Sequence, residues 1–224
     1  MSGSPPVRVL FEGGGVLAVD KPAGLLVIPG RAEEAGPSLR ELLEAELQRK
    51  VYVVHRLDRD TSGVVVFALT PGVHRALSMA FEGGQVHKHY RALVEGRFSA
   101  PLVVDAALAP ARKGRMRVAR PGEEGKPSVT RLTPVECFAG ASLVEAEPLT
   151  GRTHQIRVHL LSVGHPLLVD HQYGRAEPWG GGVLTRTPLH AARLAWPALP
   201  GVEARGFESA LPEDMASAVR RLRG

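Results

Sequence analysis

The chain has 224 residues, of which 44% are hydrophobic, and a formal net charge of +5. This apolar content suffices for the core of one large domain or two small ones. The single cysteine, Cys137, excludes a disulfide framework and a thiolate metal cluster within one chain, as is usual in a reducing compartment. The basic excess weakly favours nucleic acid or another polyanion as a partner. The sequence shows no secretory signal and no apolar run of membrane-spanning length, so we expect a cytoplasmic protein without membrane contact.

The N-terminal part predicts a strand between two turns. Residues 1–8 are expected to be flexible. A glycine-rich turn at Gly13–Gly15 precedes the apolar run Val16–Val19, which predicts a strand. Lys21–Leu25 contains proline and glycine, so it predicts a turn that ends the strand.

Two helices follow from capping and periodicity. Ser38 and Glu41 have the spacing of a capping box, and leucines follow at helical spacing, which predicts a helix from Ser38 to about Lys50. A second helix is predicted from about Pro71 to Phe81, where two glycines end the apolar pattern.

Between these helices, the charged stretch His55–Gly63 separates two apolar runs. Residues 51–54 and 64–69 are rich in β-branched side chains, and both predict buried strands. Charges so close to buried strands are costly unless they are paired or needed. Asp58 stands between two arginines, which suits an acid kept ionised near an anion. The alternative is a solvated connection, because Asp, Thr, Ser and Gly are common turn residues.

The next segments are a strand and a basic segment. Residues 87–94 predict a strand that places Lys88 and Tyr90 on the same face. Residues 112–126 contain six cations and two acids, a net +4 and nearly all of the chain's excess charge. Glycines and a proline predict a hairpin or loop there, and both RNA contact and a merely solvated loop remain open.

The segment Leu149–Leu160 opens a further predicted helix. Ile156, Leu160 and Val163 have helical spacing, and Thr153 is a candidate N-cap. The nearby histidines suggest a metal site, but His154 and His159 are five residues apart and do not share a helix face. Neither a cysteine nor an acid has ligand spacing among them until Asp170, so we expect no metal.

Several of these segments together resemble the RluA-type pseudouridine synthases. The most specific match is His-Arg-Leu-Asp-x-x-Thr-Ser-Gly at residues 55–63, followed by an apolar strand. Gly-Arg-Thr-His-Gln-Ile-Arg-Val-His-Leu at 151–160 and Lys-x-Tyr at 88–90 resemble later motifs of the family. Lys-Pro-Ala-Gly-Leu resembles its opening motif, Leu-His-Ala-Ala-Arg-Leu at 189–194 its closing strand, and residues 207–215 its C-terminal end, so the resemblance spans about residues 9–220.

The resemblance implies an α+β fold with a long mixed, mostly antiparallel sheet, flanking helices and an active-site cleft across the sheet. The predicted elements agree, because strands and helices do not alternate as they do in a parallel α/β sheet. We expect one catalytic domain over residues 1–224 that acts as a monomer. The small N-terminal S4 domain that many relatives carry is expected to be absent.

The resemblance also implies roles for individual residues. Asp58 is expected to be the catalytic carboxylate and Tyr90 to lie against the target base. Arg157 is expected to face Asp58, where its guanidinium would lower the carboxyl pKa. The ordinary alternatives are a half-buried strand tyrosine and a surface helix arginine. Further contacts with substrate or RNA are expected at His55, Arg56, Thr61, Lys88, Arg152, His154, Gln155, Arg112, Lys113, Arg115 and Arg117.

The implied reaction isomerises uridine in RNA to pseudouridine and needs no cofactor, because nothing is oxidised or added. The target base must leave the helical stack, and Arg56 is a candidate wedge or phosphate contact in the space it leaves. The carboxylate either attacks the sugar or promotes a glycal, and the RNA is transfer RNA, ribosomal RNA or both. Two rivals remain: a non-catalytic RNA-binding protein on the same fold, and a glycosidase or nucleoside hydrolase, which usually needs paired acids.

Overall fold

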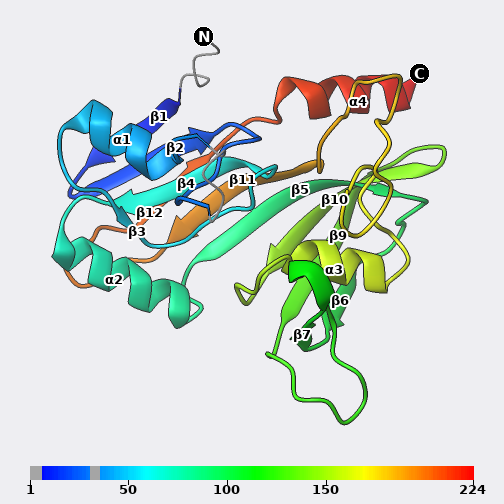
Figure 1. The fold of residues 1–224 in the computed structure, drawn as a ribbon, viewed down its shortest axis with the longest axis horizontal. Coiled ribbons are helices and arrows are strands. Elements are labelled where there is room, and N and C mark those ends of the chain that lie inside the picture. Colours follow the sequence, from blue (N-terminus) through cyan, green and yellow to red (C-terminus); the bar gives the residue numbers. More distant parts are fainter. Residues whose placement is uncertain (1–6, 31–35) are drawn as a thin grey trace. The chain divides into compact units, whose positions relative to one another are not determined.

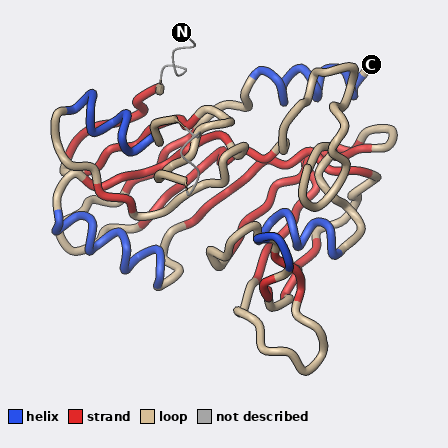
Figure 2. The backbone as a smooth tube through the Cα atoms, in the orientation of Figure 1, coloured by secondary structure: helices blue, strands red, loops and turns tan. Residues whose placement is uncertain are grey.

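The computed structural model describes residues 7–30 and 36–224 of a protein that divides into two units. Figure 1 shows the course of the chain, and Figure 2 distinguishes its helices, strands and loops. Unit 1 comprises the described residues up to His87 and Ala191–Ala210, and unit 2 comprises Lys88–His190 and Leu211–Gly224.

Unit 1 is built on strands in the order β1-β2-β4-β11, with β3 paired to β4 and β12 to β11. β1 and β2 form an antiparallel hairpin whose turn residues, Gly14 and Gly15, have φ values of 56° and 76°. Two consecutive positive φ values favour glycine, so the predicted glycine turn is confirmed. The elements of unit 1 are β1 (Arg8–Gly13), β2 (Val16–Lys21), α1 (Leu39–Leu47), β3 (Tyr52–Val53), β4 (Ser62–Ala68), α2 (Pro71–Glu82), most of β11 (Leu189–Trp196) and β12 (Arg205–Glu208).

Both predicted helices of unit 1 are confirmed. The Ser38 side chain accepts a hydrogen bond from the Glu41 backbone N–H, and the Glu41 carboxylate accepts the Ser38 N–H at 2.8 Å, which completes the capping box. The hydroxyl of Thr70 caps α2, and Pro71 occupies the first turn, where its missing N–H costs nothing.

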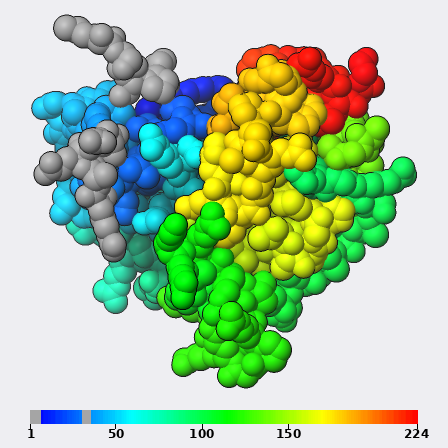
Figure 3. Space-filling view, turned by 45° about the vertical axis from the view of Figure 1, so that its right-hand side comes forward, coloured from blue at the N-terminus to red at the C-terminus, as the bar shows by residue number. Residues whose placement is uncertain are grey.

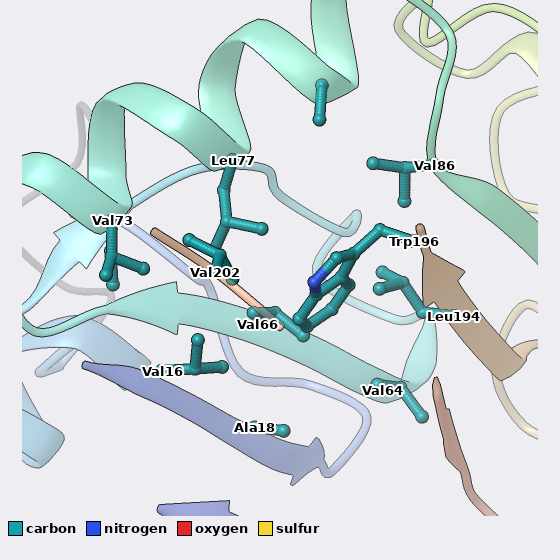
Figure 4. Packing of buried hydrophobic residues seen from close by; sticks show 12 residues of the cluster. Val16, Ala18, Val64, Val66, Val73, Leu77, Val86, Leu194, Trp196 and Val202 are labelled. Carbon is teal, nitrogen blue, oxygen red and sulfur yellow. The ribbon is translucent and has the colours of Figure 1, made fainter. Parts of the chain in front are cut away.

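One apolar cluster of unit 1 lies between α2 and the sheet. Val73 and Leu77 of α2 pack with Val64 and Val66 of β4 and with Trp196 of β11 (Figure 4). All seven residues of β4 are buried, so both faces of this strand are covered. A fully buried strand gives a nearly continuous apolar run, which explains why the sequence signals it so strongly.

Unit 2 is built on strands in the order β5-β10-β9-β6, and all three pairings are antiparallel. β7 and β8 form a separate two-stranded antiparallel sheet. The faces of β5 alternate as expected, because Ala92 and Val94 pack in one apolar cluster with Tyr90, and Leu93 packs in another. The elements of unit 2 are most of β5 (His87–Glu95), β6 (Leu102–Asp105), β7 (Leu108–Pro110), η2 (Arg112–Gly114), β8 (Met116–Val118), β9 (Val129–Cys137), β10 (Ala141–Pro148), α3 (Gln155–Ser162) and α4 (Glu213–Arg223).

These elements confirm the predicted α+β class, with a mixed, mostly antiparallel sheet and flanking helices. The single catalytic domain and the cleft across the sheet stay predictions. Residues 1–6 of the flexible terminus lie outside the described residues, whereas Arg8 already belongs to β1. Within the described part of the chain, no helix is long and apolar enough to cross a membrane.

Two local predictions need correction. Residues 51–54 contain only a two-residue strand, β3, because pairing with β4 is limited to Tyr52 and Val53. Thr153 does not cap α3: the N-cap is His154, in the left-handed region at φ 56°, without a side-chain capping bond. The Gln155 side chain instead stabilises the turn before the helix, since its amide oxygen accepts the Arg152 N–H at 3.0 Å.

Candidate active site

In unit 1, Asp58 lies in the connection from β3 to β4. Its side chain is half-buried, and Leu57 before it is buried at 6% exposure. The Asp58 carbonyl accepts the Thr61 N–H at 3.2 Å, which closes a tight turn directly before β4. Thr61 and Ser62 are buried at 2% and 4% exposure. The backbone on both sides of Asp58 is therefore fixed to the core.

The glycine that ends this motif has a steric role. Gly63 has φ +109°, and a Cβ placed there would lie 2.3 Å from the Ala191 carbonyl oxygen of β11. Only glycine combines this backbone conformation with so close an approach of a neighbouring strand. The last position of the motif thus serves the packing of β4 against β11.

The connection is also held from the other side by Lys21, at the end of β2. Lys21 is fully buried, and its ammonium donates hydrogen bonds to the carbonyl oxygens of Pro22, Leu25 and Arg59 at 3.0, 2.7 and 2.9 Å. These three acceptors match the three donors of a lysine ammonium. Lys21 therefore ties the turn after β2 to the residue that follows Asp58.

A second set of contacts reinforces this tie. The Gly24 N–H donates to the Arg59 carbonyl at 2.9 Å, and the Arg59 Nε–H donates to the Gly24 carbonyl at 3.0 Å. Gly24 has φ +84°, which favours glycine at this turn. The turn at 21–25 was predicted, but its function as a support for the Asp58 connection was not.

The first residues of the motif differ in their surroundings. The His55 Nε2 accepts the Val66 N–H at 2.9 Å, and its ring stacks on Phe81 with centroids 4.6 Å apart. These contacts give His55 a structural task within unit 1. Arg56 is exposed. The RNA contacts of His55, Arg56 and Thr61 stay predictions.

In unit 2, Lys88 and Tyr90 lie on β5 and are half-buried. The Lys88 ammonium donates to the Thr150 carbonyl at 3.4 Å, just before the Gly151–His154 segment. Burial lowers the pKa of Lys88 below its ordinary value, because it penalises the charged form. Tyr90 packs at the border of the cluster that α3 forms with β5 and β10.

Arg157 is buried in α3 at 7% exposure, so it is not the surface helix cation considered as an alternative. Its Nε and Nη2 donate to the two carboxylate oxygens of Asp170 at 2.8 and 2.7 Å, and Nη2 also donates to Gln172 at 3.1 Å. Burial raises the pKa of Asp170, but hydrogen bonds from Arg157 and from the backbone N–H groups of Gln172 and Tyr173 outweigh it, so the pKa lies below its ordinary value.

The start of α3 is organised by buried polar side chains. The Gln155 oxygen accepts from the Thr150 hydroxyl at 2.7 Å, and its Nε2 donates to the Val129 carbonyl and the Thr130 hydroxyl at 2.9 and 3.0 Å. Together with the bond from the Arg152 N–H, the Gln155 amide therefore accepts two hydrogen bonds and donates two within the protein. The RNA contact expected of Gln155 stays a prediction, and so does that of Arg152, which is exposed.

The histidines of this region have ordinary structural partners. His159 is fully buried between the Thr130 hydroxyl at 2.8 Å and the Ala106 carbonyl at 3.0 Å, and burial lowers its pKa. The His154 Nδ1 lies 2.7 Å from the Tyr173 hydroxyl. Among the residues that the structure describes, no group of three or more His, Cys, Asp or Glu could hold a metal ion.

The basic segment forms a hairpin with exposed cations. We call residues 108–126 the basic hairpin; in Figure 3 its green atoms stand out from the rest of unit 2. β7 pairs with β8, a short 3₁₀ turn lies between them, and Leu108 also exchanges two backbone hydrogen bonds with Lys126. A hairpin or loop was predicted, and this is confirmed. Five of its cations are exposed: Arg112, Lys113, Arg115, Arg120 and Lys126.

Arg117 differs from its basic neighbours. Its guanidinium makes two hydrogen bonds of 2.6 Å to the Glu123 carboxylate, which also accepts the Arg120 N–H at 2.9 Å. These bonds lower the pKa of Glu123 to about 2. The Arg117–Glu123 pair therefore braces the hairpin, whereas the exposed cations present charge to solvent.

Each unit thus assembles part of the predicted site. Unit 1 fixes Asp58, and unit 2 brings Arg157 together with Asp170 and places Tyr90 beside the same helix. The pairing of Asp58 with Arg157 joins the two units and stays a prediction. Sequence reasoning missed Lys21, Asp170 and Tyr173 as supporting residues. Their signals were weak, because a lysine in a turn and an acid thirteen residues after an arginine have no local pattern.

Comparisons with known proteins bear on what this arrangement does. The family model described as RNA pseudouridylate synthase matches residues 15–162. Ribosomal large subunit pseudouridine synthase D of Nitrosomonas europaea is 38% identical over 229 residues, covering 97% of this chain and 66% of that protein. Ribosomal large subunit pseudouridine synthase C of Escherichia coli K12 is 37% identical, covering 96% of this chain and 70% of that protein.

A solved structure named Human RNA Pseudouridylate Synthase Domain Containing 4 has the same fold. It superposes with a TM-score of 0.77 at 26% identity, over 96% of this chain and 93% of that one. The chain spans about two thirds of the length of the curated relatives that it matches. The matched residues contain Asp58, Tyr90 and Arg157, and the chain belongs to the RNA pseudouridylate synthase family.

Proposed function

We propose that the protein isomerises specific uridines of RNA to pseudouridine, with Asp58 as the catalytic carboxylate. The observation that carries this proposal is the family match over residues 15–162, which includes both motifs of the candidate site. The relatives named above are described as acting on the ribosomal large subunit, so ribosomal RNA is the first substrate to test, with transfer RNA as the second. We further propose that the protein acts as a cytoplasmic monomer.

The reaction is balanced without a cofactor. The bond between N1 of uracil and C1′ of ribose breaks, the base turns, and a bond forms between C5 and C1′. The proton on C5 is lost, and N1 gains one, so substrate and product are isomers. The base is out of the helical stack during these steps, because its reacting atoms cannot be reached inside the stack.

An ionised carboxylate serves this chemistry whether it attacks C1′ or assists formation of a glycal. The fixed backbone around Asp58 supports this role, because catalysis requires the reacting group to be held close to its productive position. Lys21 and Gly63 contribute indirectly as positioning residues. They fix the two ends of the connection on which Asp58 stands.

The residues of unit 2 complete the proposed site. Tyr90 would lie against the detached uracil and keep it captive. Arg157 would hold the Asp58 carboxylate ionised through charge-assisted hydrogen bonds. The buried pair with Asp170 supports this assignment, because it fixes the guanidinium plane by two parallel contacts. The exposed cations of the basic hairpin would contact RNA phosphates.

The test is product analysis with isosteric variants. Purified protein is incubated with ribosomal or transfer RNA labelled with tritium at C5 of uracil, and tritium release and digested nucleosides are measured. The wild-type protein and Asp60→Asn should form pseudouridine, whereas Asp58→Asn should form none while binding RNA normally. Near-normal turnover by Asp58→Asn would contradict the proposal. Free uracil would instead indicate a hydrolase, and unchanged RNA with retained binding would indicate a non-catalytic protein.

A further inference from the structure

We propose that Tyr173 is a positioning residue that docks the basic hairpin onto α3 and links RNA binding by that hairpin to the placement of Arg157. The consequence for catalysis rests on the proposed function, whereas the docking itself does not. Tyr173 lies in the segment after Leu167–Asp170, contacts the start of α3 through His154 and is 9% exposed. Nothing in the motifs of the sequence pointed to it.

The hydroxyl of Tyr173 joins two elements. It accepts a hydrogen bond from the Met116 N–H of β8 at 2.7 Å and lies 2.7 Å from the His154 Nδ1 at the start of α3. A tyrosine hydroxyl can accept one hydrogen bond and donate another at the same time. One oxygen atom therefore ties the basic hairpin to the residue that begins the Arg157 helix.

The hydrogen bond to Tyr173 matters because His154 has a strained backbone conformation. His154 has φ 56°, a left-handed conformation that is unfavourable for an L-residue and persists where its surroundings hold it. The hydrogen bond to Tyr173 is one such restraint, and the edge-on contact of the two rings, with centroids 5.4 Å apart, is another. Release of Tyr173 would remove restraints on the first turn of α3.

The rest of Tyr173 contacts Arg157. The guanidinium carbon of Arg157 lies 4.8 Å from the centre of the Tyr173 ring, which is within cation–π range. The Tyr173 N–H donates to the Asp170 carboxylate at 3.1 Å, and that carboxylate holds Arg157. The same residue therefore contacts Arg157 through its ring and supports the partner of Arg157 through its backbone.

The hairpin is braced by its own contacts and packs against the Tyr173 ring. Its strands are paired, the Ala111 N–H donates to the Arg115 carbonyl at 2.8 Å, and Arg117 is bound to Glu123. It packs on α3 in a small cluster with the Tyr173 ring, which contains Leu108, Val158, Met116 and Val118. These contacts brace the hairpin internally, and the Met116–Tyr173 bond connects it to His154 at the start of α3.

Amide hydrogen exchange of Tyr173→Phe tests the docking without any activity measurement. Phenylalanine keeps the ring and its packing but removes the acceptor of the Met116 N–H. Exchange of the Met116 amide should become about fivefold to tenfold faster, since one hydrogen bond is lost. The Ala111 amide, which is bonded inside the hairpin, should exchange at its wild-type rate. An unchanged Met116 amide would overturn the proposal, and equal acceleration of both amides would indicate general unfolding of the hairpin and would also overturn it.

Kinetics test the link to Arg157. Tyr173→Phe should weaken RNA binding and make the effect of Arg115→Ala on affinity smaller than in the wild-type background, because both changes act through the same hairpin. Tyr173→Leu, which also removes the ring from Arg157, should additionally lower the single-turnover rate at least about tenfold. Tyr52→Phe in unit 1 is the matched control and should change neither quantity.

Additive effects of Tyr173→Phe and Arg115→Ala, or equal single-turnover rates for the Phe and Leu variants, would overturn the link. Should the wild-type protein form no pseudouridine, the proposed function fails, while the exchange experiment still decides whether the hairpin is docked through Tyr173.

Discussion

The connection that carries Asp58 and the basic hairpin are both polar, glycine-containing segments, but the protein holds them in different ways. The Asp58 connection is tied to the core by a buried ammonium, Lys21, by a glycine in close contact with β11, and by buried neighbours on both sides. The hairpin is braced mainly by its own strand pairing and by the Arg117–Glu123 pair, and it is attached to α3 through one small apolar cluster and the Tyr173 hydroxyl.

This difference matches two physical requirements. A group that reacts with a substrate needs a position fixed by its supporting residues, and such support is provided by burial and by hydrogen bonds that leave no donor unused. A surface that captures a flexible polyanion needs exposed charge more than a fixed position, because counterion release depends on charge and not on close fit. Perturbing the first region should therefore affect stability and rate, and perturbing the second should affect affinity.

The largest effect is expected at Gly63. Gly63→Ala should destabilise the protein by at least about 4 kcal/mol, because its Cβ would collide with the β11 backbone at a positive φ. Gly24→Ala is the matched control, since Gly24 also has positive φ but no atom within 4 Å of the added Cβ. The free energy of unfolding of this control should fall by only about 1 kcal/mol. If urea unfolding gave equal losses of stability for the two variants, the contact with β11 would not be the reason for a glycine at position 63.

The next largest effect is expected for Arg157→Lys, which should lower the free energy of unfolding by about 3 kcal/mol. A lysine cannot make the paired contacts that hold buried Asp170. The Asp170 pKa is lowered in the folded state, so its contribution to stability is present above its unfolded pKa and is lost as the pH falls through the folded pKa. The difference in unfolding free energy between wild type and variant should therefore be largest at neutral pH and should shrink below about pH 4.

The more exposed pair Arg186–Asp214 supplies the control for that experiment. Arg186→Lys should lower the free energy of unfolding clearly less than Arg157→Lys, because the Asp214 side chain is 31% exposed and water partly compensates for the lost contacts. Equal costs for the two variants would mean that burial of the Arg157–Asp170 pair does not decide its contribution.

Lys21→Met should lower the free energy of unfolding by about 2 kcal/mol and also slow catalysis. It removes the ammonium from three carbonyl groups, of which that of Arg59 keeps only the Gly24 N–H, and it loosens the segment that follows Asp58. The exposed Lys50, changed to methionine, is the control and should leave both stability and rate near wild type. A Lys21→Met protein with an unchanged single-turnover rate would show that the clamp stabilises the fold without positioning Asp58.

The smallest effect on stability and the clearest effect on affinity are expected in the basic hairpin. Replacement of Arg112, Lys113 and Arg115 by alanine should weaken RNA binding and lower the slope of log affinity against log salt by about 0.7–0.9 for each phosphate contact removed. Arg117→Ala should change the slope less, because Arg117 is already paired with Glu123. A slope unchanged in the triple variant would indicate a merely solvated hairpin.

The sequence predicts those parts of the fold whose signals are local. The capping box at Ser38, the apolar run of β4 and the alternation along β5 each depend on residues within a few positions of one another, and all three predictions agree with the structure. The short β3 and the left-handed His154 were not predicted, because strand pairing and a strained N-cap depend on partners far along the chain.

The same distinction holds for the candidate site. Asp58, Tyr90 and Arg157 were predicted as site residues from short motifs that resemble those of the family. Lys21 and Tyr173 support them through contacts with segments 38 and 57 residues away, at the Arg59 carbonyl and the Met116 N–H. No periodic pattern or short motif encodes contacts at such separations, so only the three-dimensional structure reveals them.

The most direct test of this account is the single-turnover rate of pseudouridine formation at saturating enzyme, measured on one RNA transcript. Asp58→Asn should abolish this rate while leaving RNA affinity near wild type. The triple alanine variant of Arg112, Lys113 and Arg115 should keep most of the rate once binding is saturated, although its affinity is reduced. Substantial product from Asp58→Asn, or a saturated rate in the triple variant as low as that of Asp58→Asn, would contradict the division between a fixed catalytic connection and a charged capturing hairpin.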